Sequence, residues 1–379
     1  MKSKRQRELY SVDSGRLRSI RRRLLTWFDR EKRDLPWRKR RDAYAIWLSE
    51  SMLQQTQVAT VIPYYERFLA RFPTVEALAA ADLDEVLQLW AGLGYYARAR
   101  NLHRAAKVVA NELGGKFPTT AEGLRELPGV GDYTAGAVAS IAFGERAAVV
   151  DGNVGRVLAR LFEIESDVRT GAGKARVWEL ARELVPPSRS GDFNQALMEL
   201  GATVCLPKAS AQCLTCPLQT ECDAARNGTT TSLPVRTQRV IVKSETHVVA
   251  AIESGGKWLF VRRPEDGLWG GLWELPTAVL GDGDSGSGDN GRQTSMLASL
   301  LVGSKAGRIG TVAKAPFCEV THQLTHRTIR FVGHVCRIRG KTPITRRDDE
   351  RWIPIDEAGT LGISNAMQKV LGELRRAAR

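Results

Sequence analysis

Two different hydrophobic patterns divide this chain. From residue 44 to about residue 143, apolar positions recur three and four residues apart, which predicts short amphipathic helices joined by Pro- and Gly-containing turns. The same helical pattern continues over residues 154–162 and 178–184. No segment before residue 235 has the pattern of a strand. We therefore predict one all-α domain over residues 1–225.

The pattern changes after residue 225. A polar stretch around residues 228–234 predicts a linker, which we place at 226–239. Runs of β-branched and aromatic residues beyond it predict strands at 240–242, 247–252, 258–261 and 329–335. Residues 281–291 contain only Gly, Asp, Ser and Asn, which predicts a flexible surface loop. The second domain, 240–379, is therefore predicted to be of the α+β class.

Charge indicates an acidic partner. The 379 residues carry a formal net charge of +14, which favours binding to polyanions such as nucleic acid. With 43% hydrophobic residues the chain is ordinary for a globular protein, and neither a membrane span nor a secretory signal is visible. We expect a cytoplasmic monomer, associated with the nucleoid in a bacterium. Twelve basic residues lie within 16–41, where a solvated helix face is the simplest interpretation.

Four of the six cysteines lie close together. Cys205, Cys213, Cys216 and Cys222 have the spacing C-x7-C-x2-C-x5-C. Zinc sites usually show two C-x2-C pairs, or one such pair with two His, whereas this array has one pair and no His between its members. The spacing also suits a 4Fe-4S cluster, and buried cysteines without a metal are the remaining alternative.

A glycine-containing turn precedes an apolar helix. Gly129, Val130 and Gly131 lead directly into the helical pattern that starts near residue 133. Glycines let a backbone approach a ligand closely, and free amides at a helix N-terminus bind phosphate. An ordinary helical hairpin turn is the alternative. In a basic helical chain, the motif resembles the helix-hairpin-helix that holds a DNA backbone without reading its sequence.

Two acidic residues stand in apolar surroundings. Asp151 follows the run Ala-Ala-Val-Val and precedes a helical pattern, which by itself predicts a helix N-cap. Glu50 lies in a strongly apolar helical segment. It stands either at the solvated edge of that segment or in a pocket where burial raises the pKa of the carboxyl group. A protonated and an ionised carboxyl group together are the arrangement that breaks glycosidic bonds.

Several motifs occur in the order of one known family. The chain resembles MutY-type adenine DNA glycosylases of the endonuclease III superfamily over roughly residues 30–225. The resemblance rests on the hairpin and on the segments LPWR at 35–38, WLSE at 47–50, MLQQTQ at 52–57, GLGYYARARNL at 92–102 and VDGN at 150–153. It implies a 4Fe-4S cofactor and removal of flipped-out adenine from mispairs with 8-oxoguanine and guanine in double-stranded DNA.

The resemblance also implies roles for single residues. Glu50 matches the acid that protonates adenine, and Asp151 matches the carboxylate that stabilises the oxocarbenium-like sugar. Asn153 would orient Asp151, and Tyr133 would line the same pocket. The residues that match substrate-binding positions are Trp37, Arg38 and Leu53 around the flipped base, Leu93, and Gln55, Thr56 and Tyr95 at the duplex or the orphaned base.

One position separates related activities. Bifunctional relatives have a Lys just after the hairpin glycines, where its amine can form a Schiff base, whereas this chain has Tyr133. We therefore expect base excision without an efficient strand-cleaving step. A thymine mismatch glycosylase of the same superfamily could share that Tyr and is an alternative for the first 225 residues.

The second domain resembles a Nudix fold. Residues 267–276, GLWGGLWELP, are similar to the opening of that fold in MutY proteins, but residues 277–303 contain no Glu to hold Mg²⁺. A lesion-binding module is therefore favoured over a nucleotide pyrophosphatase. Its candidate recognition residues are Thr325 and His326, preceded by Leu324 where the family commonly has Phe. A non-catalytic iron-sulfur DNA-binding protein is a further alternative, disfavoured by the presence of both Glu50 and Asp151.

Overall fold

The structure is a computed structural model that describes residues 12–237, 242–280, 297, 309–313, 315–338 and 348–378. The chain forms two compact units, Met1–Ala80 with Asn101–Arg239, and Ala81–Arg100 with Val240–Arg379. Residues 81–100, which the sequence analysis placed in the first domain, thus cluster with the second unit. The predicted surface loop 281–291 and the end of the predicted linker lie outside the described residues.

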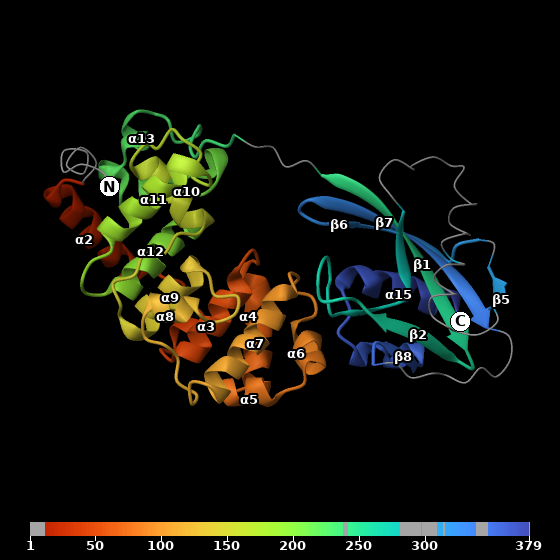
Figure 1. Ribbon diagram of the computed structural model, residues 1–379. Coiled ribbons are helices and arrows are strands. Elements are labelled where there is room, and N and C mark those ends of the chain that lie inside the picture. The colour runs from red at the N-terminus through yellow and green to blue at the C-terminus, as the bar shows by residue number, and fades with distance from the viewer. Residues whose placement is uncertain are drawn as a thin grey trace. The chain divides into compact units, whose positions relative to one another are not determined.

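The first unit is built of helices, and its described residues contain no strand (Figure 1). The all-helical prediction for this part of the chain is confirmed. Helix α7 crosses the boundary between the units. The α-helices with residues in this unit are α2 (Ser14–Glu31), α3 (Ala43–Leu53), α4 (Val58–Arg71), α5 (Val75–Ala80), α7 (Ala97–Asn111), α8 (Ala121–Arg125), α9 (Asp132–Phe143), α10 (Gly152–Leu161), α11 (Gly171–Leu184), α12 (Ser190–Thr203) and α13 (Asp223–Arg226).

Helices α3 and α9 form the interior of this unit because they are apolar on all sides. Residues 44–52 of α3 and 134–140 of α9 are buried. Small side chains on α9 let the chain that follows it pass directly across the helix. A Cβ atom at Gly136 would lie 2.4 Å from the carbonyl oxygen of Ala148, so a larger residue would push this segment away. Close packing here therefore fixes the approach to Asp151.

A second core joins α2 to α10, α11 and α12. The basic run 16–41 is only partly a solvated face. Arg16 forms an ion pair with Asp223 at 2.9 Å, and Arg21 donates to the carbonyl oxygens of residues 183–185. Arg33 and Arg38 bind a buried carboxylate described below. Much of the run therefore holds the N-terminal helix and the segment after it against the rest of the unit.

The second unit contains a mixed sheet, helix α6 (Leu83–Trp90) and helix α15 (Asn365–Ala377). Strands β1 and β7 run parallel in its centre, and the other described pairs are antiparallel. The strands are β1 (Lys243–Ser254), β2 (Lys257–Arg262), β3 (Trp273–Glu274), β4 (Thr277–Leu280), β5 (Ile309–Val312), β6 (Cys318–Gln323), β7 (Arg327–Ile338) and β8 (Glu350–Ile353). The α+β class is confirmed.

Three of the four predicted strands lie within β1, β2 and β7. The prediction at 240–242 was wrong for Val242, which precedes β1, and residues 240–241 lie outside the described part. One face of the sheet packs on α15 through Phe260, Phe331 and Leu371, among others. Leu259 and Ile252 belong to the core on the opposite face.

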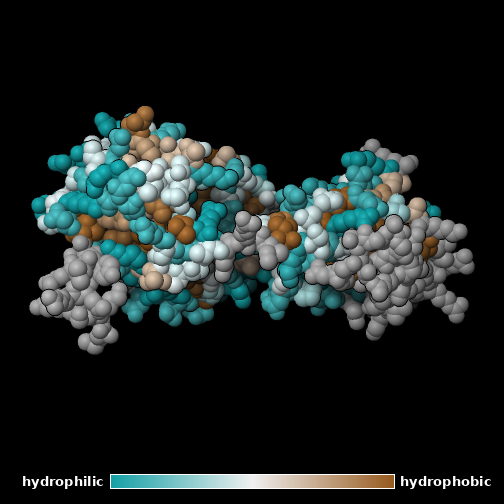
Figure 2. Space-filling view, turned by 90° about the horizontal axis from the view of Figure 1, so that it is seen from above, coloured by the Kyte–Doolittle hydropathy of each residue, from teal (hydrophilic) through white to brown (hydrophobic). Residues whose placement is uncertain are grey.

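The surface of the described residues is mainly polar, with scattered apolar side chains, on the face that Figure 2 shows. No helix in the described part of the chain is long and apolar enough to cross a membrane.

Candidate active site and cysteine cluster

A cavity of about 150 Å³ lies in the first unit between α3, α9, α12 and the start of α10. It brings together eight of the residues proposed from sequence for catalysis or base binding. These are Trp37, Arg38, Glu50, Leu53, Thr56, Tyr133, Asp151 and Asn153. Trp37 and Asn153, which are 116 positions apart in the chain, thus border one space, and both acidic residues belong to it.

Glu50 lies inside this cavity rather than at a solvated helix edge. It is 5% exposed, and the hydroxyl group of Tyr133 donates a hydrogen bond to its Oε2 at 2.6 Å. Burial raises the pKa of Glu50 to about 7, although the hydrogen bond from Tyr133 opposes this rise. A carboxyl group with this pKa is protonated in a large fraction of molecules at neutral pH, so it can act as an acid.

Asp151 is the N-cap of α10, as the local sequence predicts. Its Oδ1 accepts a hydrogen bond from the backbone N–H of Val154 at 2.7 Å, and its Oδ2 accepts one from Nδ2 of Asn153 at 3.0 Å. Burial raises the pKa of Asp151 above its ordinary value, while these hydrogen bonds favour the ionised form and limit the rise. Glu50 and Asp151 therefore have different surroundings, which act differently on the pKa of each.

The cavity also contains a carboxylate that the sequence analysis missed. Glu199 on α12 is 2% exposed and accepts hydrogen bonds from Nε of Arg33 at 2.7 Å and from Nη2 of Arg38 at 2.8 Å. Burial alone would raise the pKa of Glu199, but these two guanidinium groups lower it to about 2. The signal that identified Glu50, an acid within an apolar helical segment, is equally present around Glu199.

Arg156 connects Asn153 to the cysteine loop. Its Nη2 donates to Oδ1 of Asn153 and to the carbonyl oxygen of Gly201, both at 2.8 Å. Its Nε donates to the carbonyl oxygen of Cys205 at 2.8 Å. Asn153, which donates to Asp151, is therefore fixed by Arg156, and Arg156 in turn binds the backbone at Cys205.

The glycine turn forms a helical hairpin between α8 and α9. Gly129 has a φ of +75°, and a Cβ atom there would lie 2.4 Å from Cβ of Asn101, so glycine is needed at this position. Val130 is buried, whereas a Cβ atom at Gly131 would meet open space. Gly131 is the N-cap of α9, which leaves the first amides of this helix available to a phosphate.

The other proposed recognition residues do not line the cavity. Leu93, Tyr95, Thr325 and His326 belong to the second unit, where Leu93 is buried. The hydroxyl groups of Tyr95 and Thr325 lie 3.1 Å apart, and Thr325 and His326 are exposed in the turn between β6 and β7. Gln55 is exposed beside the cavity-lining Thr56.

Gln55 and Tyr95 share an unusual backbone conformation, with φ of +57° and +48°. Side chains other than glycine rarely adopt it, and such strain concentrates at binding sites.

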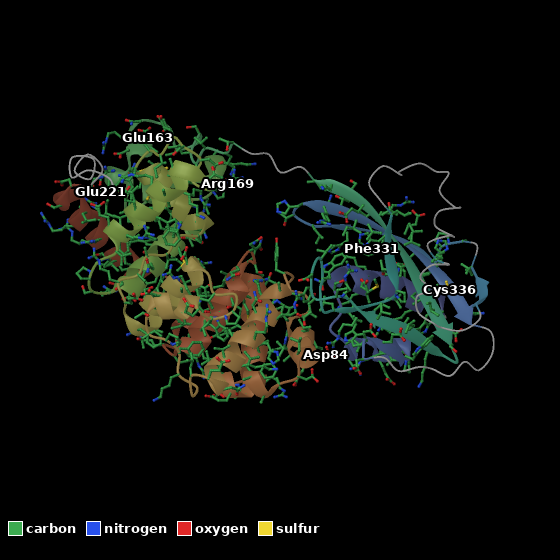
Figure 3. The ribbon with its side chains drawn as sticks, in the orientation of Figure 1. Asp84, Glu163, Arg169, Glu221, Phe331 and Cys336 are labelled. Carbon is green, nitrogen blue, oxygen red and sulfur yellow. The ribbon has the colours of Figure 1, made fainter. Side chains whose placement is uncertain are left out.

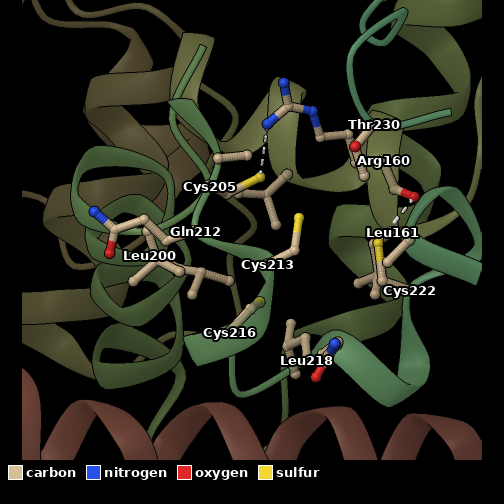
Figure 4. Close-up of a pocket in the computed structure, with 15 residues that line it drawn as sticks. Arg160, Leu161, Leu200, Cys205, Gln212, Cys213, Cys216, Leu218, Cys222 and Thr230 are labelled. Carbon is tan, nitrogen blue, oxygen red and sulfur yellow. Dashed lines mark hydrogen bonds between the residues drawn. The ribbon is translucent and has the colours of Figure 1, made fainter. Parts of the chain in front are cut away.

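The four clustered cysteines surround one cavity of the first unit, as Figure 4 shows. The other lining residues include no His, Asp or Glu, so sulfur is the only strong metal donor present. Burial raises the pKa of Cys216 to about 12. Arg160, which is 2% exposed, donates from Nη1 to the Cys205 sulfur at 3.4 Å. Burial thus favours the neutral thiol, and a bound metal cation would be needed to ionise such a group.

Comparison with known proteins agrees with this arrangement. Residues 48–187 match the family model described as HhH-GPD superfamily base excision DNA repair protein, and residues 247–373 match a NUDIX domain. The chain is 40% identical to an adenine DNA glycosylase of Rattus norvegicus, in an alignment that covers 94% of this chain and 78% of the relative. This chain belongs to the adenine DNA glycosylase family.

Two further similarities fit this assignment. The human adenine DNA glycosylase is 39% identical over 94% of this chain and 74% of its own length. A thermostable thymine-DNA glycosylase of known structure is 32% identical with a TM-score of 0.51, but it covers only 56% of this chain. The adenine DNA glycosylases thus match nearly the whole chain, whereas the thymine enzyme covers little more than half of it. The chain is a DNA glycosylase of base excision repair.

We predict that kcat/KM for adenine excision has a bell-shaped dependence on pH, because this ratio reports the groups of the free enzyme. With Glu50 as the acid, the rate is expected to fall above about pH 7, where this group loses its proton. With Asp151 as the stabilising anion, the rate is expected to fall at low pH, where its carboxylate is protonated.

Tyr133→Phe is the matched variant for this measurement. It removes the hydrogen bond that lowers the pKa of Glu50, so the alkaline limb is expected at higher pH than in the wild type. An alkaline limb that stays in place or moves to lower pH would contradict the assignment of Glu50 to it.

Proposed function

We propose that this enzyme, acting as a monomer, removes adenine from mispairs with 8-oxoguanine and with guanine in double-stranded DNA. The observation that carries the proposal is the pair of buried acids, Glu50 with a pKa of about 7 and the hydrogen-bonded Asp151, on one cavity.

The chemistry follows from the two protonation states. Glu50 donates its proton to a ring nitrogen of adenine, and the electron pair of the glycosidic bond passes to the departing base. Asp151 remains ionised and stabilises the positive charge that develops on the sugar. Water then adds to the sugar carbon and releases a proton. Tyr133 has a pKa raised well above its ordinary value by burial, so it stays a neutral hydrogen-bond donor and offers no amine for strand cleavage.

An adenine inside the duplex cannot reach this cavity, so the nucleotide has to be flipped out of the stack. The hairpin before α9 supports this step because backbone amides can hold the phosphates without reading sequence. Gln55, beside the cavity, has an exposed amide that can replace stacking or hydrogen bonding in the gap left by the base.

We expect Asp151→Asn to bind the mispaired duplex but to lose excision by about 100-fold or more, because the amide retains the capping shape and lacks the charge. Single-turnover rates on adenine opposite 8-oxoguanine measure this loss. Asp192→Asn, at the start of α12 on the surface, is the control and should leave the rate unchanged. Near wild-type excision by Asp151→Asn would refute its role.

The second unit is proposed to read the opposite base. The tip between β6 and β7 presents the hydroxyl of Thr325 next to that of Tyr95, together with the exposed His326. These groups can donate or accept hydrogen bonds that differ between 8-oxoguanine and guanine. Leu324 supports the tip by packing against the core of the sheet rather than by facing a base.

The double variant Thr325→Ala with His326→Ala is therefore expected to reduce the preference for 8-oxoguanine over guanine by about 10-fold, since a lost contact costs about 1 to 3 kcal/mol. Adenine excision opposite guanine should change little. Single-turnover rates on the two adenine duplexes measure this preference. A thymine–guanine duplex tests the alternative activity. An unchanged ratio of the two adenine rates would overturn the role of the tip.

We also propose that Cys205, Cys213, Cys216 and Cys222 hold a 4Fe-4S cluster. Within the described residues, no three His, Cys, Asp or Glu side chains converge as they would on a single ion. Support for the proposal comes from the four cysteines that line one cavity and from their spacing, which suits such a cluster. When bound, such a cluster would cross-link the loop 205–222 and keep it packed on the second core of the helical unit.

Protein purified without oxygen is accordingly expected to be brown and to contain about four iron atoms per chain. Cys213→Ser should lower the iron content and the soluble yield, whereas Cys318→Ser, in the second unit, should retain the iron. Stoichiometric zinc in place of iron would refute the cluster.

A further inference from the structure

The turn that follows α3 presents Gln55, the residue proposed above to fill the gap left by the flipped base. Gln55 is exposed and has a φ of +57°, a conformation that persists only where neighbouring contacts hold it. Within the turn, the backbone N–H of Thr56 donates to the carbonyl oxygen of Leu53, and the Thr56 hydroxyl donates to that of Gln54, both at 3.3 Å. Because both bonds are internal, they set the shape of the turn rather than its direction.

A side chain just before Gln55 joins this turn to helix α9. Nε2 of Gln54 donates a hydrogen bond to Oγ1 of Thr134 at 3.0 Å. Thr134 is 2% exposed, so the acceptor is held by the packing of the core, whereas Gln54 is half-buried at the end of α3. A buried acceptor that loses its donor is costly, which favours this one placement of the turn.

The first turn of α9 makes two successive side-chain contacts with α3 and the residue after it. Tyr133 donates to Glu50, and the next residue, Thr134, accepts from Gln54, four positions further along than Glu50. Helix α9 packs beside α3, and Figure 3 shows the side chains that lie along both ribbons. The same helix begins after Gly131, where the hairpin leaves amides available to a phosphate. One helix end therefore connects the hairpin, the acid and the turn.

We propose that Gln54 is a positioning residue, whose hydrogen bond to Thr134 aligns Gln55 with the phosphate-binding hairpin during extrusion of adenine. Its effect rests on the proposed flipping of adenine and insertion of Gln55. A side chain that fills the gap in the stack has to arrive in register with the DNA backbone that the hairpin holds. Without the bond, Gln55 keeps its own side chain but the turn that carries it can move. Glu50 keeps its separate donor, Tyr133, so its proton transfer is unaffected.

Extrusion can be measured apart from excision in full-length Asp151→Asn protein, in which excision is expected to be stopped. A 2-aminopurine placed next to the target adenine, opposite 8-oxoguanine in the duplex, fluoresces more strongly when its neighbour leaves the stack. Gln54→Met removes the donor at similar length, and Thr134→Val removes the acceptor at similar shape. Each should lower the extrusion equilibrium by about tenfold, as expected for one lost hydrogen bond. The double variant should lose no more than either single variant, because all three break the same bond.

Two variants of α9 are the matched controls. Thr134→Ser retains the hydroxyl that accepts from Gln54 and should keep the extrusion of the parent protein. Ser140→Ala removes another buried hydroxyl of this helix, which donates to the carbonyl oxygen of Ala137 and accepts from Nδ2 of Asn194. It should lower the thermal stability of the protein and leave extrusion unchanged, because this hydroxyl does not contact the turn.

The pH profile separates a positioning residue from one that acts on the catalytic acid. With Asp151 intact, Gln54→Met should lower kcat/KM for adenine excision at every pH and leave the alkaline limb where it lies in the wild type. Tyr133→Phe, by contrast, is expected to move that limb to higher pH because it changes the donor to Glu50.

The possible failures are distinguishable. Undiminished extrusion in both Gln54→Met and Thr134→Val, or losses that add in the double variant, would overturn the positioning role of Gln54. An equal loss of extrusion in Ser140→Ala would overturn it as well, because general loosening of α9 would then suffice. Undiminished extrusion in Gln55→Ala would instead overturn the proposed insertion of Gln55, and rapid excision by Asp151→Asn would overturn the proposed chemistry.

Discussion

The first unit depends on placing two carboxyl groups inside an apolar helical core. Burial disfavours the charged form of any acid, and in this core it raises the pKa of both Glu50 and Asp151. The neighbouring donors then offset this rise in pKa differently at the two groups. Glu50 has one donor, the Tyr133 hydroxyl, whereas Asp151 has the backbone of a helix N-terminus and the amide of Asn153. The same desolvation cost thus acts on both acids, and the surrounding hydrogen bonds offset it to different degrees.

Glu199 shows that burial alone does not decide the charge of an acid. It is at least as enclosed as Glu50, yet its pKa is about 2 because two guanidinium groups donate to it. In return, Glu199 fixes Arg38 and Arg33 at the wall of the cavity. A carboxylate paired with two guanidinium groups organises the wall of the cavity, whereas Glu50 beside it has a neutral donor, the Tyr133 hydroxyl, and keeps a raised pKa.

Charged side chains also connect parts of the chain that are distant in sequence. Arg156 joins Asn153 to the backbone of the cysteine loop, and Arg160 joins the same loop to Leu233. Because both guanidinium groups bind backbone carbonyls, they fix the course of segments that have little regular structure of their own. Asp167 extends this arrangement to Thr237, the last described residue before the second unit.

The sequence determined the features that depend on local pattern. Helical periodicity identified the first unit, and runs of β-branched and aromatic residues located parts of β1, β2 and β7. Asp151 was recognisable as an N-cap because capping needs only the residues next to it. The motifs around Glu50, Tyr133 and Asp151 also indicated one site, which the cavity contains. Only the tertiary structure decided the rest, because pairing between distant segments leaves no local pattern. It set Glu199 against Arg33 and Arg38, placed residues 81–100 with the second unit, and turned a polar stretch that resembled a free linker into a segment held by Glu163, Arg160 and Asp167.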